Sequence, residues 1–277
     1  MSDELYYRSW RRPGPVPPGG VEPEEGETLD YLTGHFRIFQ YAEGHRYSTD
    51  DVLTAWYATQ WAPTVSRAAD LGSGIGSVAL IVAWRLPGAT LCTVEAQPMS
   101  IRLARESVRY NGLSSRFALY EGDLRDPAVL ANEEPFDLVT GSPPYFPPGT
   151  ATKAEHPQAI PARIEVRGTV VDYAAAAARI LAPGGLFAFV FPYLQRERAE
   201  SALAASDFVL VRRRDVVFKE GKPPMLSLFA AQRAADLPAG RTTWIEPPLT
   251  IRRTDGSTHP EYSAVRLSFG IPPGDVP

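Results

Sequence analysis

The sequence DLGSGIG, at residues 70–76, separates two segments of different hydrophobic pattern. RAADL (67–71), before it, is a short apolar run typical of a strand, and SVALIVAWR (77–85), after it, has the length and composition of a helix. The three glycines of the connection allow a tight turn and a close approach of the backbone to a ligand. The stretch therefore predicts a strand–loop–helix unit with a ligand at its loop.

The alternation of strand and helix patterns continues on both sides of this unit. Further strands are predicted at residues 89–96, 116–123, 136–141 and 186–192, and helices at 50–60, 98–112, 168–185 and 195–205. Two longer β segments, 207–218 and 225–233, are expected to pair antiparallel at one edge. Together the seven β segments predict an α/β fold with a doubly wound, seven-stranded, Rossmann-like sheet, mostly parallel with an antiparallel edge strand. Ligands of such sheets bind beyond the carboxyl ends of the strands.

The composition is that of a globular protein without metal or membrane signals. Hydrophobic residues make up 44% of the 277 residues and charged residues 22%, which is sufficient for a packed core. The single cysteine, Cys92, excludes an internal disulfide framework, and the four histidines lack metal-ligand spacing, so no metal is expected. No apolar run approaches about 20 residues, and the acidic N-terminus is unlike a signal peptide. These features predict a cytoplasmic protein with no membrane partner.

Three regions are expected along the chain. Residues 1–27 are dominated by proline, glycine and glutamate, a composition that predicts a flexible tail. Residues 28–235 carry the alternating pattern and are expected to form one domain. Residues 236–277 follow the last predicted strand, and we expect a C-terminal extension packed on the same domain.

Acidic residues are expected at the carboxyl ends of three successive strands: Asp70, Glu95 and Asp123. An acid beside the glycine loop repels a pyrophosphate, and neither the G-x-G-x-x-G nor the P-loop pattern is present. The ammonium group of S-adenosylmethionine (SAM) suits Asp70, its ribose hydroxyls suit Glu95, and its adenine amine suits Asp123. The predicted cofactor-binding residues are Asp70, Gly72, Gly74, Gly76, Glu95, Ala96, Asp123 and Leu124.

The segment SPPYF, at residues 142–146, leaves the strand expected to lie beside the first one, and therefore beside the cofactor. Pro143 and Pro144 fix the backbone, so that the Ser142 hydroxyl and the Pro143 carbonyl can both accept hydrogen bonds from one amino group. When both hydrogens of an amine conjugated to a base are held by hydrogen bonds, the amine favours its pyramidal form, which is the more nucleophilic one. Tyr145, with Phe146 in reserve, is expected to stack on that base. No metal or covalent nucleophile is required, because SAM already carries an activated methyl group.

These motifs resemble those of class I SAM-dependent methyltransferases acting on exocyclic amines, and more specifically the bacterial methyltransferases of adenine 37 in valine tRNA. The similarity extends through LDYLTGHFRIFQYAEGHRYSTDDVLTAWYA (29–58), PPYFPPG (143–149) and PARIEVRGTVVDYAAAAARILAPGG (161–185). The resemblance implies the methyltransferase form of the sheet, SAM as cofactor and a tRNA anticodon loop as substrate. It also implies that Gln40, Tyr47 and Asp50 line the methionine end of the SAM site, with Ser142 next to the cofactor.

Ser142 departs from this family, which usually has Asn at that position. Serine there is also similar to the amino-cytosine methyltransferases of DNA restriction systems, so the alternatives are a DNA cytosine or adenine, a protein glutamine or a small amine. A DNA enzyme is expected to carry an added target-recognition domain, and none is evident. A further alternative is a protein that binds SAM without transferring its methyl group.

Basic residues concentrate in the second half of the chain, whereas acids are in excess in the first half. This asymmetry predicts a nucleic-acid surface within a protein whose net charge is −4. The predicted nucleic-acid-binding residues are Lys153, Arg163, Arg167, Arg212, Arg213, Arg214, Lys219 and Lys222. The long segment 146–167 is expected to order over an RNA loop.

Overall fold

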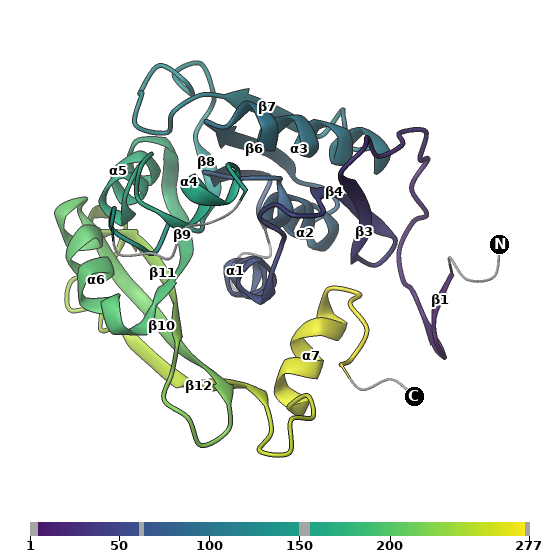
Figure 1. Cartoon of the computed structure of the whole chain (residues 1–277). Coiled ribbons are helices and arrows are strands. Elements are labelled where there is room, and N and C mark those ends of the chain that lie inside the picture. Colours follow the sequence, from purple (N-terminus) through teal and green to yellow (C-terminus); the bar gives the residue numbers. More distant parts are fainter. Residues whose placement is uncertain (1–4, 61–63, 150–155, 275–277) are drawn as a thin grey trace.

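The computed structural model describes residues 5–60, 64–149 and 156–274, which centre on one eight-stranded sheet (Figure 1). The strand order is β12-β10-β11-β9-β8-β5-β6-β7. The strands are β5 (Arg67–Leu71), β6 (Thr90–Glu95), β7 (Phe117–Glu121), β8 (Phe136–Gly141), β9 (Leu181–Pro192), β10 (Phe208–Lys219), β11 (Leu226–Arg233) and β12 (Trp244–Arg252). Every pairing is parallel except the two made by β11. From β5 the next strands along the chain, β6 and β7, lie on one side, and the later strands, from β8 onward, lie on the other. Because β5, β6 and β8 are parallel, their carboxyl ends meet at the same edge of the sheet.

The sheet has eight strands rather than the predicted seven. The additional strand, β12, comes from the C-terminal extension and runs parallel to β10 at the edge. Its sequence, WIEPPLTIR, contains Pro247 and Pro248, which interrupt the alternating pattern that predicts a strand. An edge strand tolerates them, and the β10–β12 register shifts beside them, between Arg214 and Val216. The antiparallel strand, β11, lies between β9 and β10 and therefore not at the edge of the sheet.

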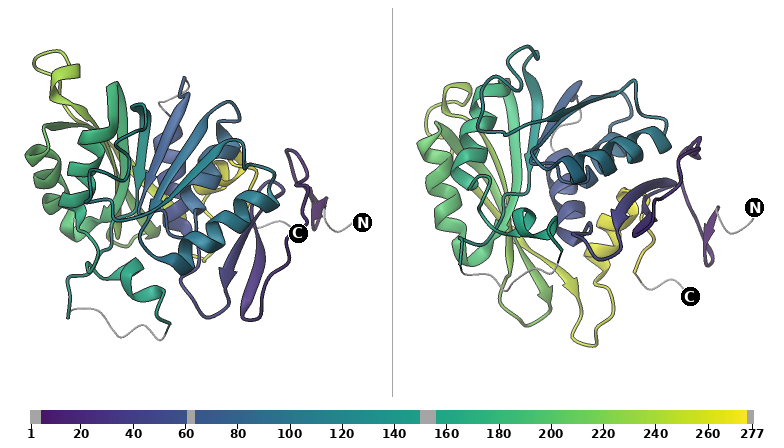
Figure 2. Two further views of the ribbon diagram at one scale, coloured as in Figure 1. Left: turned by 90° about the horizontal axis from the view of Figure 1, so that it is seen from above. Right: turned by 45° about the horizontal axis from the view of Figure 1, so that its top comes forward.

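Helices cover both faces of the sheet (Figures 1 and 2). One face carries α1 (Thr49–Thr59), α2 (Ser77–Arg85), α3 (Pro98–Tyr110) and α7 (Pro260–Ser268), and the other carries α5 (Val170–Ile180) and α6 (Arg196–Ala205). Successive strand residues alternate between the two cores: Ala68 and Leu138 pack with the first group, and Ala69 and Val139 with the second. The nearly continuous apolar strands follow from this burial on both sides.

Element boundaries agree with the predicted ones except after α5. Ser48 caps α1, and the Asp51 side chain accepts from the Ser48 backbone, which completes a capping box. The helix predicted at 168–185 ends at Ile180, because Leu181 has an extended backbone and already pairs with Phe136 of β8. Residues 181–185 therefore lengthen β9 at its amino end.

The N-terminal region also differs from its prediction as a flexible tail. Within residues 5–27 there is a short hairpin of β1 (Tyr6–Tyr7) and β2 (Trp10–Arg11), and Arg12 is buried with its guanidinium 3.3 Å from the centroid of the Tyr31 ring. The amide of Gly19 donates to the Tyr110 carbonyl at the end of α3. Aromatic and backbone contacts of this kind depend on tertiary packing, so composition alone did not reveal them. A second hairpin, β3 (Glu27–Thr33) and β4 (Phe36–Tyr41), leads into α1.

Three short elements complete the chain. Of these, α4 (Ala159–Arg163) and η2 (Ala234–Asp236) lie at opposite ends of the sheet (Figure 2, left), and η1 (Tyr193–Gln195) joins β9 to α6. Across the part of the chain that the structure describes, no helix is long and apolar enough to cross a membrane.

Candidate functional site

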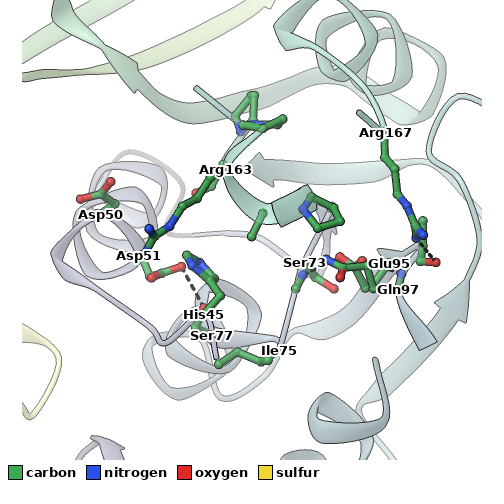
Figure 3. A pocket seen from close by; sticks show the side chains of 18 of the residues that line it. His45, Asp50, Asp51, Ser73, Ile75, Ser77, Glu95, Gln97, Arg163 and Arg167 are labelled. Carbon is green, nitrogen blue, oxygen red and sulfur yellow. Dashed lines mark hydrogen bonds between the residues drawn. The ribbon is translucent and has the colours of Figure 1, made fainter. Parts of the chain in front are cut away.

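A cavity of about 610 Å³ opens at the carboxyl ends of β5, β6 and β8 (Figure 3). Its walls are the loop after β5, the end of β6, the start of α1, the segment that follows β8, and α4. This volume falls within the range of small-molecule sites, about 300–1,000 Å³. The position is the one where ligands bind in doubly wound sheets.

The glycine loop after β5 forms one wall because its backbone is left-handed. Gly72, Gly74 and Gly76 have φ angles of 59°, 56° and 82°, a backbone conformation that residues with side chains rarely adopt. At Gly72 a Cβ atom would lie 1.9 Å from the Tyr173 hydroxyl, whereas at Gly74 it would meet no atom within 4 Å. Gly72 therefore allows the close approach of α5, and Gly74 leaves open space at the cavity wall.

Glu95 fixes the position of this loop relative to β6. Its Oε2 accepts from the Gly74 amide at 2.8 Å, and its Oε1 accepts from the Gln97 amide at 2.7 Å. Burial raises the pKa of Glu95, and the two backbone donors partly offset that effect. The carboxylate is thus oriented on the cavity wall before any ligand is bound.

Asp70 lies beneath the glycine loop rather than on the cavity wall. It is buried, and its Oδ1 accepts from the Thr140 hydroxyl on β8 at 2.8 Å. Burial raises the pKa of Asp70 to about 7, against the lowering effect of that hydrogen bond. Asp70 thus lies behind the cavity wall, and its predicted contact with a cofactor ammonium group stays a prediction.

The SPPYF segment forms the opposite wall, and all five of its residues line the cavity. The amides of Tyr145 and Phe146 both donate to the Arg163 carbonyl, at 3.2 and 3.0 Å, and the Gln195 side chain donates to the Tyr145 carbonyl at 2.9 Å. The Oγ atom of Ser142 is buried and has no hydrogen-bond partner among the described residues. A rigid backbone thus holds an unpaired hydroxyl at the cavity.

Tyr145 is held at both ends of its side chain. Its hydroxyl donates to Asp50 Oδ2 at 2.7 Å, and its ring meets the Phe191 ring edge-on with centroids 6.0 Å apart. Burial raises the pKa of Asp50 to about 6, and the bond from Tyr145 partly offsets this. The side chain of Phe146 is 42% exposed. Of the two aromatic residues, Tyr145 has the fixed ring and Phe146 the accessible one.

The structure brings most of the predicted cofactor residues to the cavity. In addition to Asp70, three of them lie outside it. Those on the wall are Tyr47, Asp50, Gly72, Gly74, Glu95, Ala96, Leu124 and Ser142. Gly76 instead caps α2, and Gln40 is buried behind the wall, where its Oε1 accepts from the Tyr47 amide. Asp123 is bound by the Arg125 guanidinium through both carboxylate oxygens and is not among the residues that line the cavity, so its contact with a cofactor stays a prediction.

Several wall residues were not predicted, and His45 and Asp51 are the most prominent. Burial lowers the pKa of His45, and Asp51 Oδ1 accepts from the Ser77 hydroxyl at 2.8 Å. Both lie near Arg163 in Figure 3, although they come from different elements. Asp51 carries a local signal as the third residue of a capping box, but that signal predicts a helix start and not a site. The remaining unpredicted wall residues with polar side chains include Arg46, Ser48, Ser73, Ser77, Gln97 and Tyr173.

The predicted nucleic-acid residues divide into three groups. Arg163 and Arg167 line the cavity, and the Arg167 side chain donates to the Ala96 carbonyl at 2.6 Å. Lys219 and Lys222 are exposed. Lys153 lies outside the described residues.

Arg212, Arg213 and Arg214 do not form the predicted phosphate-binding patch. Alternation along β10 directs Arg212 and Arg214 toward α1 and Arg213 toward α6. Arg212 is 0% exposed and donates to the Tyr57 carbonyl and to Glu246, while Arg213 pairs with Glu200 and Arg214 with Glu261. These arginines serve the packing of the sheet.

No group of three or more His, Cys, Asp or Glu side chains is placed to hold a metal ion within the described ranges. The residues that line the cavity instead offer carboxylates, loop amides, the unpaired hydroxyls of Ser73 and Ser142, and aromatic rings. Such groups bind and orient a polar organic cofactor and a planar substrate.

Comparison with known proteins agrees with this geometry. Residues 51–204 match the model of the methyltransferase small domain family. A tRNA1(Val) (adenine(37)-N6)-methyltransferase of Porphyromonas gingivalis is 29% identical over 246 residues, covering 84% of this chain and 91% of that protein. The enzyme of the same name from Pectobacterium carotovorum is 30% identical over 189 residues, covering 67% of this chain and 73% of the enzyme.

Among solved structures, a predicted O-methyltransferase from Agrobacterium tumefaciens superimposes with a TM-score of 0.61, covering 80% of this chain and 98% of its own. The two are 22% identical, so the superposition shows a shared fold. The family match spans the strands, the glycine loop and the SPPYF segment that together build the cavity. The chain belongs to the methyltransferase small domain family.

Proposed function

We propose that the protein transfers a methyl group from SAM to the exocyclic N6 amine of an adenine in a single-stranded loop of tRNA. One observation carries the proposal. The SPPYF segment, with its unpaired Ser142 hydroxyl, lines the same cavity as the glycine loop and Glu95. A site for a methyl donor and a site for an amine therefore share one space.

The residues of one cavity wall fit SAM. Gly74 leaves room where a side chain would stand, and Glu95 presents a buried carboxylate that can accept from ribose hydroxyls. Tyr47, Asp50, Ala96 and Leu124 border the remaining volume and would hold the other parts of the cofactor. When bound, SAM supplies an activated methyl group, so the protein's contribution is alignment.

The opposite wall fits an amine conjugated to a planar base. The Ser142 hydroxyl and the Pro143 carbonyl accept hydrogen bonds from the amine and thereby favour its pyramidal form. Because its hydroxyl is bonded to Asp50, the Tyr145 ring cannot turn freely and limits where a base can lie. Phe146 adds an exposed ring on which the base or its neighbour can stack, a contact worth about 1–3 kcal/mol.

The identity of the substrate rests on the relatives. Those with 28–30% identity carry the name tRNA1(Val) (adenine(37)-N6)-methyltransferase, and the similarity with the Porphyromonas protein extends over most of both chains. A base in a single-stranded loop also suits the site, because it need not be extracted from a duplex at a cost of a few kcal/mol.

The test is incubation of the purified protein with methyl-labelled SAM and, separately, total tRNA, DNA and protein. Nucleoside mass spectrometry is expected to find N6-methyladenosine in tRNA digests alone. Glu95→Gln serves as the inactive control, and Glu121→Gln, which changes the exposed glutamate paired with Glu95 on β7, serves as the active control. Label in cytosine or protein would contradict the adenine assignment, and cofactor binding without transfer would identify a non-catalytic protein.

A further inference from the structure

The carboxyl edge of the sheet continues beyond the cavity as a ridge that ends in cations. It begins with Leu194 and Met225, whose side chains are 87% and 61% exposed. It ends at the turn between β10 and β11, with Lys219 and Lys222, and at the end of β12, with Arg252 and Arg253; all four are exposed. We call these six residues the edge ridge.

Strand direction places the whole ridge on the same edge as the site. β10 and β9 are both antiparallel to β11 and therefore run in the same direction, and β12 is parallel to β10. The ends of β9, β10 and β12 consequently lie at the edge where β8 delivers the SPPYF segment. The β10–β11 turn and the loop after β12 lie side by side in Figure 1 and in the right view of Figure 2.

A chain of hydrogen bonds makes the ridge continuous with the site. The Gln195 side chain donates to the Tyr145 carbonyl within SPPYF, and the neighbouring Tyr193 amide donates to the Met225 carbonyl. At the far end, the Glu220 amide, beside Lys219, donates to the Arg252 carbonyl. The apolar and the cationic parts of the ridge are thus fixed relative to the target-base wall.

None of the four cations at the end of the ridge forms an ion pair within the described residues. Two acids stand near them, but Glu220 accepts from the Thr254 amide and Asp255 from the amide and hydroxyl of Ser257. This contrasts with Arg213 and Arg214 on the same strand, which are paired with carboxylates. Four cations beside two carboxylates leave an excess of positive charge at the end of the ridge, in a protein whose net charge is −4.

We propose that the edge ridge binds the RNA strand adjoining the target adenine, with unstacked bases on Leu194 and Met225 and phosphates at the four cations. This inference rests on the proposed function, because it assumes that a nucleic-acid base enters the cavity. Charge complementarity selects a polyanion, and apolar side chains between the site and the cations suit a single strand with accessible base faces.

Sheet geometry sets the distance between the target adenine at the end of β8 and the cations at the end of β10. Strands β8 and β10 are separated by three spacings of about 4.8 Å, or about 14 Å. The strand registers also place Lys219 about six residues beyond the level of Gly141, roughly 20 Å further along the strands. Phosphates several positions from the target base, not those next to it, are expected to reach the cations.

The experiment reverses two charges at the ridge and two elsewhere. Lys219→Glu/Lys222→Glu is compared with Arg85→Glu/Arg109→Glu, which removes exposed cations from the ends of α2 and α3 at the opposite edge and changes the net charge equally. The KM for tRNA is measured at several salt concentrations, together with kcat and SAM affinity; unchanged SAM affinity shows that each variant is folded.

We expect the ridge variant to raise the KM for tRNA about tenfold or more at low salt. The slope of log KM against log salt should become shallower by about 0.7 for each phosphate that the variant no longer neutralises. The value of kcat at saturating tRNA should be unchanged. A trinucleotide centred on adenine, too short to span both parts of the surface, should be methylated equally by wild type and variant.

Equal KM values for the ridge variant and the opposite-edge variant would overturn the ridge assignment, as would an equal loss with the trinucleotide. In both cases the wild type still methylates tRNA. Failure of the proposed function is a different result, because the wild type itself then methylates no tRNA.

Discussion

Ser142 combines a structural cost with a proposed chemical role. A buried hydroxyl without a hydrogen-bond partner costs about 1–3 kcal/mol, and the Ser142 Oγ atom has none in the described structure. Ser142 is one of the residues that line the cavity, and by our proposal an amine bound there supplies the missing bond. Stability and activity should therefore respond in opposite directions when this hydroxyl is removed.

Ser142→Ala tests that opposition. We expect kcat to fall about 10- to 100-fold, since the variant cannot form one hydrogen bond to the reacting amine, while the midpoint of urea unfolding stays the same or rises. Ser142→Asn restores an acceptor of the kind usual in related enzymes and should keep more activity than the alanine variant. Full methyl transfer by Ser142→Ala would show that this hydroxyl does not hold the amine.

Asp70 predicts a dependence of stability on pH. Burial raises its pKa from an ordinary value of 3.8 to about 7, so between these pH values the folded protein binds more protons than the unfolded chain. The contribution of Asp70 to stability is therefore greatest below pH 4 and is lost as pH rises toward 7. Asp70→Asn keeps an acceptor for the Thr140 hydroxyl but does not titrate.

Chemical unfolding of both proteins from pH 5 to pH 8 measures this effect. The asparagine variant should gain stability relative to wild type as pH rises, by up to about 1.4 kcal/mol for each pH unit over which the folded protein keeps the Asp70 proton and the unfolded chain does not. A constant difference between the two proteins across the range would mean that Asp70 is ionised throughout.

At the scale of elements, the glycine loop joins β5 to α2 under two separate constraints. Both Gly72 and Gly74 have a left-handed backbone, so alanine costs about 1–2 kcal/mol at either position. Only at Gly72 would the new methyl group collide with the Tyr173 hydroxyl. Gly72→Ala should therefore lower the free energy of unfolding more than Gly74→Ala, and the Tyr173→Phe change should recover part of the additional loss.

Denaturant unfolding of the three variants, with cofactor affinity measured alongside, separates the two constraints. Gly74→Ala should weaken cofactor binding and lose only the stability that the left-handed backbone costs, because Gly74 lines the cavity and its methyl group would meet no protein atom. Equal stability losses for Gly72→Ala and Gly74→Ala would show that α5 shifts to accommodate the methyl group.

The sequence was sufficient for elements whose pattern is local. Strands buried on both faces read as apolar runs, and α3 is amphipathic with Pro98 at its start, so both were predicted within a few residues. β12 was not predicted, because Pro247 and Pro248 break its pattern and only its place at the edge allows them. To assign it as a strand one must know that it pairs with β10, and such pairing is a tertiary contact that the local pattern does not show.

The site was predictable to the same extent. Glu95 and the SPPYF segment follow directly from strand ends and were found, because the ends of parallel strands meet at one edge. Tyr173 was missed because it lies about 100 residues along the chain and reaches Gly72 only through the packing of α5. The ion pair of Asp123 with Arg125, two residues away, was not predicted, because the sequence does not distinguish a paired acid at a strand end from an open one.

At the scale of the whole molecule, the C-terminal extension has two roles that sequence charge alone did not separate. Its strand β12 completes the sheet, and Glu246 on that strand pairs with the buried Arg212. The end of the same strand carries Arg252 into the edge ridge. Cations of β10 and β12 thus contribute to stability in the middle of the strands and, by our proposal, to RNA binding at their ends.

Arg212 provides the test of this division. Its guanidinium donates to the Tyr57 carbonyl at 2.6 Å and lies 4.0 Å from the Tyr57 ring centroid, while Tyr57 itself donates to Glu246 at 2.8 Å. Arg212→Ala would leave Glu246 buried without its cation, a change that costs about 3–5 kcal/mol. We expect a large fall in the urea midpoint and, at a temperature where the variant is folded, no change in the KM for tRNA or its salt dependence.

Lys222→Ala should show the reverse, with normal stability and a raised KM for tRNA. A raised KM for tRNA together with wild-type stability in folded Arg212→Ala would show that Arg212 binds RNA. We do not expect this result, because Arg212 of β10 is buried beneath β12 and α1 and offers no face that a phosphate could contact.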